Sequence, residues 1–253
     1  MVKALLVRGM LAGAIAGLLA FGFAYTFGEP EIDYAIGFEQ QMEQAAHAQS
    51  GAAGAVHEHE EELVPRTVQA GIGLLTAVVI YGAGIGGLFA IVFALAYGRI
   101  GQLGPRATAA LLAAAGFVSV AMIPFLKYPA NPPAVGSPET LGDRTALFLI
   151  MIAISLMAVM LAIGLTRRLL ARLGRWPSAA IGGAAFVAVI ALAYLLLPDV
   201  REIPEQFSTD ALWRFRAASL GMQLLIWAVL GLVFGWLTER LLGRAAARGV
   251  KAR

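Results

Sequence analysis

Six long runs of this chain contain no Asp, Glu, Lys, Arg or His, and they constrain its fold more than any other feature. They are residues 9–28, 67–98, 107–126, 145–166, 176–198 and 217–238. An α-helix rises about 1.5 Å per residue, so about 20 residues cross a hydrocarbon core about 30 Å thick. Each run is long enough for one crossing, and the second is longer than one crossing needs. The sequence therefore predicts an all-α integral membrane protein with six transmembrane helices.

The composition agrees with this fold class, because 59% of the residues are hydrophobic and only 14% are charged. In soluble domains, about 45–50% of the residues are apolar and about 25% are charged. We expect one polytopic membrane domain over residues 1–253, in contact with membrane lipid, with spans at about residues 9–28, 70–97, 107–126, 145–166, 177–198 and 217–238. The chain has no cysteine, which excludes disulfides and thiolate metal sites. Basic and acidic residues are divided between the loops on the two sides, so the net charge of +3 does not indicate a nucleic-acid partner.

Basic residues are divided unevenly between the two sides of this topology. The side that holds both termini has thirteen of the nineteen Lys and Arg residues. The positive-inside rule places that side in the cytoplasm. Fifteen of the sixteen acidic residues lie on the other side, and Glu239 is the exception. The sequence thus predicts cytoplasmic N- and C-termini and an extracytoplasmic loop at residues 29–66.

One alternative concerns the first span. Lys3 and Arg8 before an apolar run resemble the start of a secretory signal peptide. The run is longer than the usual apolar region of about 7–15 residues, and it ends in the aromatic stretch "FGFAYTFG". We therefore expect the span to be retained, whereas cleavage would leave five spans with the same loop outside.

Glycines in the first two spans recur at helical spacing. Gly9, Gly13 and Gly17 follow steps of four residues, and Gly82 and Gly86 repeat that step. Small residues at this spacing let two helix backbones approach closely. The stretch "GAGIGG" also matches G-x-G-x-x-G, but a dinucleotide site needs a strand before the glycines. We predict helix packing for all five glycines.

The three histidines of the chain all lie in the outer loop, two of them in "HEHEEE" (57–62). Imidazole binds Zn, Cu, Ni and similar ions, whereas carboxylates bind harder ions. The candidate metal ligands are His47, His57, His59, Glu43, Glu58 and Glu60. The tract does not match the zinc-protease pattern H-E-x-x-H, and a solvated acidic surface is the other interpretation. Because several divalent ions accept these ligands, we expect a capture site and not the selectivity site.

The outward turn after the third span, "PFLKYPANPPAVGSPETLGDR" (124–144), contains five prolines. Proline fixes φ and disfavours helix in the preceding residue, so a stiff, extended loop is predicted. We expect Lys127, Tyr128, Asn131 and Arg144 to form an ordered outward rim on it.

The interiors of the spans offer only neutral polar groups, such as Thr76, Tyr81, Ser119, Ser155 and Gln223. Intramembrane ionisable residues usually mark ion and proton pathways. A permeation path here would need carbonyls, hydroxyls, water or ligands from a partner. No span contains a histidine that could activate a serine, and no phosphate-binding loop is present, so we do not expect an enzyme.

The segment "PFLKYPANPPAVGSPETLGDRTALFL" (124–149) resembles the CbtA family, the predicted membrane subunit of a bacterial cobalt transporter. Residues 87–101 and 212–235 are similar to the same family, and "KYPANPP" is the most distinctive part. The resemblance implies a bacterial cytoplasmic membrane location and a link to cobalamin metabolism. It also implies a transient Co²⁺ ion in place of a permanent cofactor, and a small single-span partner, CbtB, with a histidine-rich end. The family is usually described with five spans, one fewer than counted here.

The expected function is that of the membrane subunit of a divalent metal uptake transporter, with cobalt indicated by the resemblance. The outer loop would collect the ion. A non-transporting scaffold or metal-sensing partner stays open as an alternative, as does a membrane enzyme acting on a lipid or a tetrapyrrole. Metal accumulation by whole cells separates transport from both.

Overall fold

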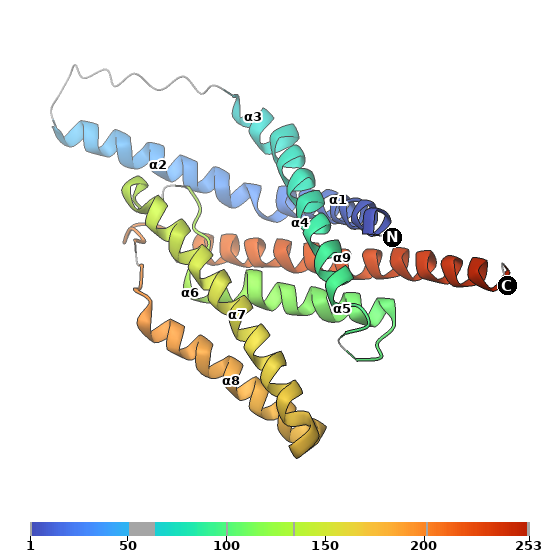
Figure 1. The fold of residues 1–253 in the computed structure, drawn as a ribbon. Coiled ribbons are helices and arrows are strands. Elements are labelled where there is room, and N and C mark those ends of the chain that lie inside the picture. Colours follow the sequence, from blue (N-terminus) through green and yellow to red (C-terminus); the bar gives the residue numbers. More distant parts are fainter. Residues whose placement is uncertain (1, 51–63, 100, 134, 201, 252–253) are drawn as a thin grey trace. The chain divides into compact units, whose positions relative to one another are not determined.

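The computed structural model describes residues 2–50, 64–99, 101–133, 135–200 and 202–251, and this part of the chain is helical with no strand (Figure 1). The α-helices are α1 (Val2–Phe27), α2 (Glu29–Ser50), α3 (Arg66–Val68), α4 (Leu74–Ala96), α5 (Pro105–Gly116), α6 (Ile123–Lys127), α7 (Leu141–Leu173), α8 (Arg175–Leu196) and α9 (Thr209–Lys251). Two π-helices, η1 (Gln69–Gly73) and η2 (Phe117–Met122), and one 3-10 helix, η3 (Pro138–Thr140), lie between them.

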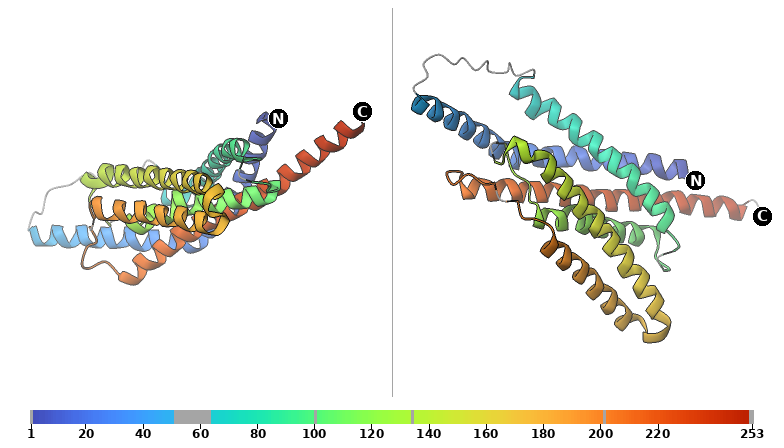
Figure 2. Two further views of the ribbon diagram at one scale, coloured as in Figure 1. Left: turned by 60° about the horizontal axis from the view of Figure 1, so that its bottom comes forward. Right: turned by 60° about the vertical axis from the view of Figure 1, so that its left-hand side comes forward.

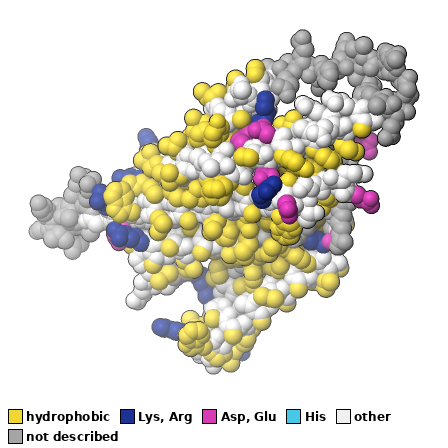
Figure 3. All heavy atoms as spheres, turned by 180° about the vertical axis from the view of Figure 1, so that it is seen from behind, with side chains coloured by type: hydrophobic (Ala, Val, Ile, Leu, Met, Phe, Trp, Pro, Cys, Tyr) yellow, Lys and Arg dark blue, Asp and Glu magenta, His cyan; other side chains and the backbone are white. Residues whose placement is uncertain are grey.

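Six helical segments of the described chain are long and apolar enough to cross a membrane. They are Val2–Phe27, Arg66–Ala96, Pro105–Lys127, Leu141–Leu173, Arg175–Leu196 and Thr209–Gly243. This confirms the all-α fold with six spans. Apolar side chains also dominate the face shown in Figure 3, as expected for helices that contact lipid acyl chains.

The helices divide into two compact units. Unit 1 contains residues 1–114, 132–134 and 208–253, and unit 2 contains residues 115–131 and 135–207. In unit 1, α1 packs against α4 and α9. In unit 2, α7 packs against α8, and the two run side by side in both views of Figure 2. The boundary between the units falls within the third span.

The core of unit 1 combines a small-residue contact with an aromatic cluster. The buried face of α1 consists of Leu5, Gly9, Ala12, Gly13, Ala16, Gly17 and Ala20. Phe89 and Phe93 of α4 meet Phe234 of α9 edge to face, with ring centroids 5.3 and 5.0 Å apart. This arrangement favours the positive edge of one ring over the negative face of the other.

The segment predicted as an outer loop is helical over its first half, residues 29–50. Helix α1 ends where the N–H of Gly28 donates to the carbonyl of Ala24, at 2.7 Å. The carbonyl of Gly28 then accepts the N–H groups of Glu31 and Ile32 and starts α2. Pro30 is compatible with this first turn, where its missing N–H has no helical acceptor.

The core of unit 2 surrounds the end of the third span. Ile123, Tyr128, Met151 and Ala193 form a buried cluster. The third span is interrupted just before Pro124 by the π-helix η2. A proline removes one helical hydrogen bond and its ring crowds the preceding turn, and the wider π turn accommodates both effects.

Candidate functional site

Most predicted metal ligands lie outside the described residues. These are His57, His59, Glu58 and Glu60. The backbone of His47 belongs to α2, but its side chain is also outside the description. Glu43 is exposed on α2. Among the side chains that are described, no group of three or more His, Asp or Glu residues is placed to hold a metal ion, so the capture site stays a prediction.

The first turn of α2 is tied to the rest of unit 1 by ion pairs. Arg66 pairs with Glu29, and its Nη2 lies 3.0 Å from Oδ1 of Asp33. Glu31 pairs with Arg214 of α9, 2.7 Å from its Nε. The Glu29 side chain is only 9% exposed, so the nearby guanidinium compensates for its lost hydration. These contacts anchor α2 at its base and pair the three carboxylates closest to the spans with two guanidinium groups.

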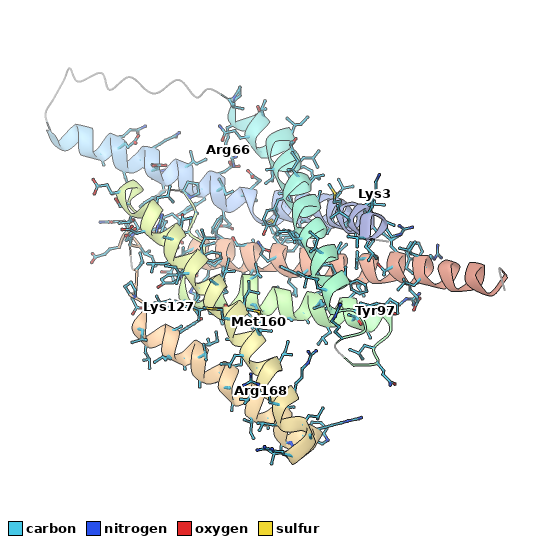
Figure 4. The ribbon with its side chains drawn as sticks, viewed as in Figure 1. Lys3, Arg66, Tyr97, Lys127, Met160 and Arg168 are labelled. Atoms are coloured by element: carbon cyan, nitrogen blue, oxygen red, sulfur yellow. The ribbon has the colours of Figure 1, made fainter. Side chains whose placement is uncertain are left out.

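The ammonium group of Lys127 is enclosed at the end of the third span (Figure 4). Its Nζ donates to the carbonyl of Tyr194 at 3.0 Å and to Oδ1 of Asp199 at 2.5 Å. It also lies 5.9 Å from the ring centroid of Tyr128 and 5.8 Å from that of Tyr194. The side chain is 7% exposed, and a carboxylate, a carbonyl and two π faces stabilise its charge there.

Two tyrosine hydroxyls strengthen the same connection between the third and fifth spans. Tyr128 donates to the carbonyl of Pro198 at 2.8 Å, and Tyr194 donates to the carbonyl of Ile123 at 2.9 Å. Burial raises the pKa of the Tyr128 phenol. The charge of Lys127 acts against this rise in the pKa, and the charge of Asp199 adds to it. The phenol therefore remains a protonated donor at neutral pH.

Arg144 belongs to a second network, around Glu202. Oε2 of Glu202 accepts the Thr140 hydroxyl at 2.7 Å and the Ser137 N–H at 3.1 Å, and it lies 3.8 Å from Arg144. The hydrogen bond from Thr140, then that from Ser137, and the charge of Arg144 lower the pKa of the Glu202 carboxyl. Gly136, with φ of 111°, leaves room for the guanidinium because a Cβ there would collide with it.

The predicted rim residues therefore lie in two neighbouring networks of unit 2. Lys127 and Tyr128 contact the end of the fifth span, Arg144 contacts Glu202, and Asn131 is half-buried on the same loop. Sequence reasoning missed Tyr194 and Asp199, the partners of Lys127. The available signal was the stretch "AYLLLPD", which places an aromatic ring and a carboxylate at the boundary of a span.

The five predicted packing glycines meet across the contact of α1 with α4. A Cβ on Gly9 would overlap the carbonyl oxygen of Gly86, and a Cβ on Gly13 would overlap that of Gly82. A Cβ on Gly17 would lie 2.6 Å from the carbonyl oxygen of Val78. Since all these neighbours are backbone atoms, a side chain at these positions would have to push the helices apart.

Comparison with known families decides the identity of the chain. A model of the CbtA family, described as a probable cobalt transporter subunit, matches residues 2–239. The chain belongs to the CbtA family. The match includes "KYPANPP" and reaches from α1 into α9, so CbtA membership covers both units. Comparison of this CbtA chain with curated proteins and with solved structures finds no match.

The family description, a probable cobalt transporter subunit, and the six apolar helices agree with the predicted class of membrane transport protein. The word subunit implies a partner, and a transporter subunit is not an enzyme. The buried polar side chains that CbtA offers within its described spans are neutral ones: Thr108, Ser119, Ser155, Ser178 and Thr238. The chemistry available there is coordination or hydrogen bonding by oxygen.

Proposed function

We propose that this chain is the membrane-embedded subunit of a transporter that takes up a divalent metal ion, Co²⁺, across the bacterial cytoplasmic membrane. The family match over residues 2–239 carries the proposal, and the six apolar helices support it. Both termini lie in the cytoplasm and residues 29–66 lie outside in this proposal, because the basic residues are concentrated on the side of the termini.

The outer segment raises the local metal concentration in this proposal. Glu29, Glu31 and Asp33 at the base of α2 are engaged in ion pairs, while Glu39 and Glu43 further along the helix are exposed. Exposed carboxylates bind an ion weakly, because solvent and salt screen their charge within about 8 Å. Weak binding suits an entry site, since an ion that moves on must also be released.

The rim of unit 2 orders the outer mouth in this proposal. Lys127 and Arg144 are both engaged by carboxylates, so they hold the span ends and do not repel an arriving cation as free charges would. Asn131 fixes the proline-rich loop by hydrogen bonding. An Asn131→Ala chain that takes up cobalt normally would remove this residue from the mechanism.

A partner subunit supplies metal ligands in this proposal. The buried polar residues in the interiors of the described spans are neutral, and a divalent cation is costly to desolvate without stronger ligands. A small single-span protein with a histidine-rich end, like CbtB, would provide imidazoles. The same neutral interiors favour the second candidate function, a non-transporting scaffold or metal-sensing partner.

Radiolabelled cobalt uptake tests the proposal. Cells without their own cobalt importer would express the chain, the suspected partner, both, or neither, with membrane levels checked by immunoblot. Cobalt should accumulate with time only when this chain is present, and most with both proteins. Accumulation no higher than in empty cells, with both proteins in the membrane, would reject transport and leave the scaffold.

A further inference from the structure

Ser119 is a buried polar residue of the third span that neither the capture segment nor the rim uses. It is 1% exposed, and its Oγ has no hydrogen-bond partner. A serine in a helix commonly donates to the carbonyl four residues earlier. The two other buried serines of the described chain do this: Ser155 donates to Met151 at 2.6 Å, and Ser178 donates to Gly174 at 2.7 Å.

The backbone around Ser119 is also unusual. Ser119 belongs to the π-helix η2, in which the N–H of Ile123 donates to the carbonyl of Val118, five residues earlier. The next residue in this register is Pro124, which would pair with the carbonyl of Ser119 but has no N–H. The carbonyl of Ser119 therefore receives no hydrogen bond from that position. Both oxygens of one buried residue are available to a ligand.

A second buried hydroxyl of unit 2, that of Ser155, lies on α7, the helix that packs against η2. Ile123 and Met151 share the buried cluster, and η2 packs against α7. Because consecutive spans run antiparallel, we expect the residues one turn further along from this cluster, Ser119 on the third span and Ser155 on the fourth, to lie at a similar depth. The Ser155 hydroxyl donates its hydrogen to Met151, but its oxygen retains lone pairs that can bind a cation.

We propose that the hydroxyl and carbonyl of Ser119, with the oxygen of Ser155, coordinate the transported divalent cation part-way across the membrane. This inference rests on the proposed uptake function and names a site for the ion within it. Three neutral oxygens replace part of the hydration shell, and the ion keeps its remaining waters. Because no carboxylate takes part, the ion is held weakly and passes on.

Thiol chemistry tests the site without requiring transport. The chain contains no cysteine, so Ser119→Cys introduces a single thiol, nearly isosteric with the hydroxyl and a better ligand for Cd²⁺. Ser178→Cys is the matched control, since Ser178 is equally buried in the same unit but hydrogen-bonded. In membranes that contain the purified protein, Cd²⁺ or Co²⁺ should slow modification by a small methanethiosulfonate about tenfold at position 119 only.

Uptake gives the second measurement. Ser119→Ala should raise the KM for cobalt about tenfold, the effect of roughly one lost ligand, while Ser178→Ala leaves it unchanged. Cd²⁺ should block cobalt uptake by Ser119→Cys and not by Ser178→Cys, and dithiothreitol should reverse the block. If cells that express the wild-type chain took up no cobalt, the proposed function would be rejected. The modification assay would still show whether a metal ion binds at position 119.

Three outcomes would overturn the inference. One is equal response of the two cysteine variants to Cd²⁺, whatever the alanine variants do. Another is a thiol at position 119 that reacts at the same rate with and without the ions, which would indicate that water alone occupies the position. A thiol there that the reagent never reaches, together with uptake that Cd²⁺ does not affect, would also overturn it.

Discussion

Lys127 and Asp199 are 72 positions apart in the sequence and form an ion pair of 2.5 Å between the ends of the third and fifth spans. The two side chains are unequally exposed, 7% for Lys127 and 65% for Asp199. If Asp199 were removed, the ammonium would stay buried beside one carbonyl and two rings. If Lys127 were removed, the carboxylate would turn to water.

This asymmetry predicts which partner matters more for stability. Asp199→Ala should lower the free energy of unfolding by about 1–3 kcal/mol, because it leaves a buried charge poorly compensated. Lys127→Met should cost less, and adding it to Asp199→Ala should restore part of the loss. Thermal unfolding in detergent measures all three variants. A larger loss for Lys127→Met than for Asp199→Ala would contradict the asymmetry.

The glycines of α4 allow a matched comparison within one helix. A Cβ on Gly82 would overlap the carbonyl oxygen of Gly13, whereas a Cβ on Gly84 would meet nothing within 4 Å. Gly82→Ala should therefore destabilise the protein, because α1 and α4 must separate. Gly84→Ala should be neutral or stabilising by up to about 1 kcal/mol, the difference in helix propensity. Equal melting temperatures for the two variants would show that this close contact is not made.

The hydrogen bonds of Glu202 predict a pH dependence. The pKa of its carboxyl is lowered from 4.5, so its contribution to stability is present above pH 4.5 and is lost as the pH falls through the lower folded value. The wild-type protein should have a higher melting temperature than Glu202→Gln at neutral pH, and this difference in melting temperature should disappear in acid. Thr140→Val removes the largest cause and should reduce the difference. If the difference in melting temperature stayed constant from pH 7 to pH 3, ionisation of the Glu202 carboxyl would be excluded as its cause.

Replacing His47, His57 and His59 by Ala together tests the capture segment. Uptake should weaken at limiting cobalt and stay nearly intact at saturating cobalt, because the segment concentrates the ion and does not select it. Uptake by wild type at limiting cobalt should also decrease below a pH of about 6.5, since imidazole must be neutral to bind metal. Loss at every concentration, or a change in the accepted metal, would make the segment the selective site.

Topology can be measured by cysteine labelling, with no background because the chain has no cysteine. A Ser50→Cys protein in intact cells should react with a membrane-impermeant maleimide. Gln102→Cys, in the turn between the second and third spans, should react only after the membrane is opened. The reverse pattern would place the acidic side in the cytoplasm.

The sequence was sufficient for the helices because their signals are local. Absence of charge over about 20 residues predicts a span, and a step of four between Gly9, Gly13 and Gly17 predicts one small-residue face. Both are properties of one segment. The structure adds which faces meet, for example Gly13 with Gly82.

The contacts between distant segments could not be predicted in this way. Lys127 has a local signal as a basic residue at a span end, but nothing near it in sequence names Asp199 or Tyr194 as partners. The π-helix before Pro124 is similar: a proline predicts a disturbance, but whether a kink, a break or a wider turn results depends on packing against α7. His57 and His59, two of the predicted metal ligands, lie outside the described residues, so their role rests on the sequence alone.

The close approach of α1 and α4 has a consequence for biosynthesis. All residues of this contact lie within the first 96 residues of the chain, whereas α9, which packs on the same pair, begins at residue 209. The two helices can therefore associate as soon as the second span enters the bilayer, while more than half of the polypeptide has yet to leave the ribosome. The last span then docks on a preformed surface. Incorrect packing of α1 and α4 would thus also disturb the packing of the spans that enter the membrane later.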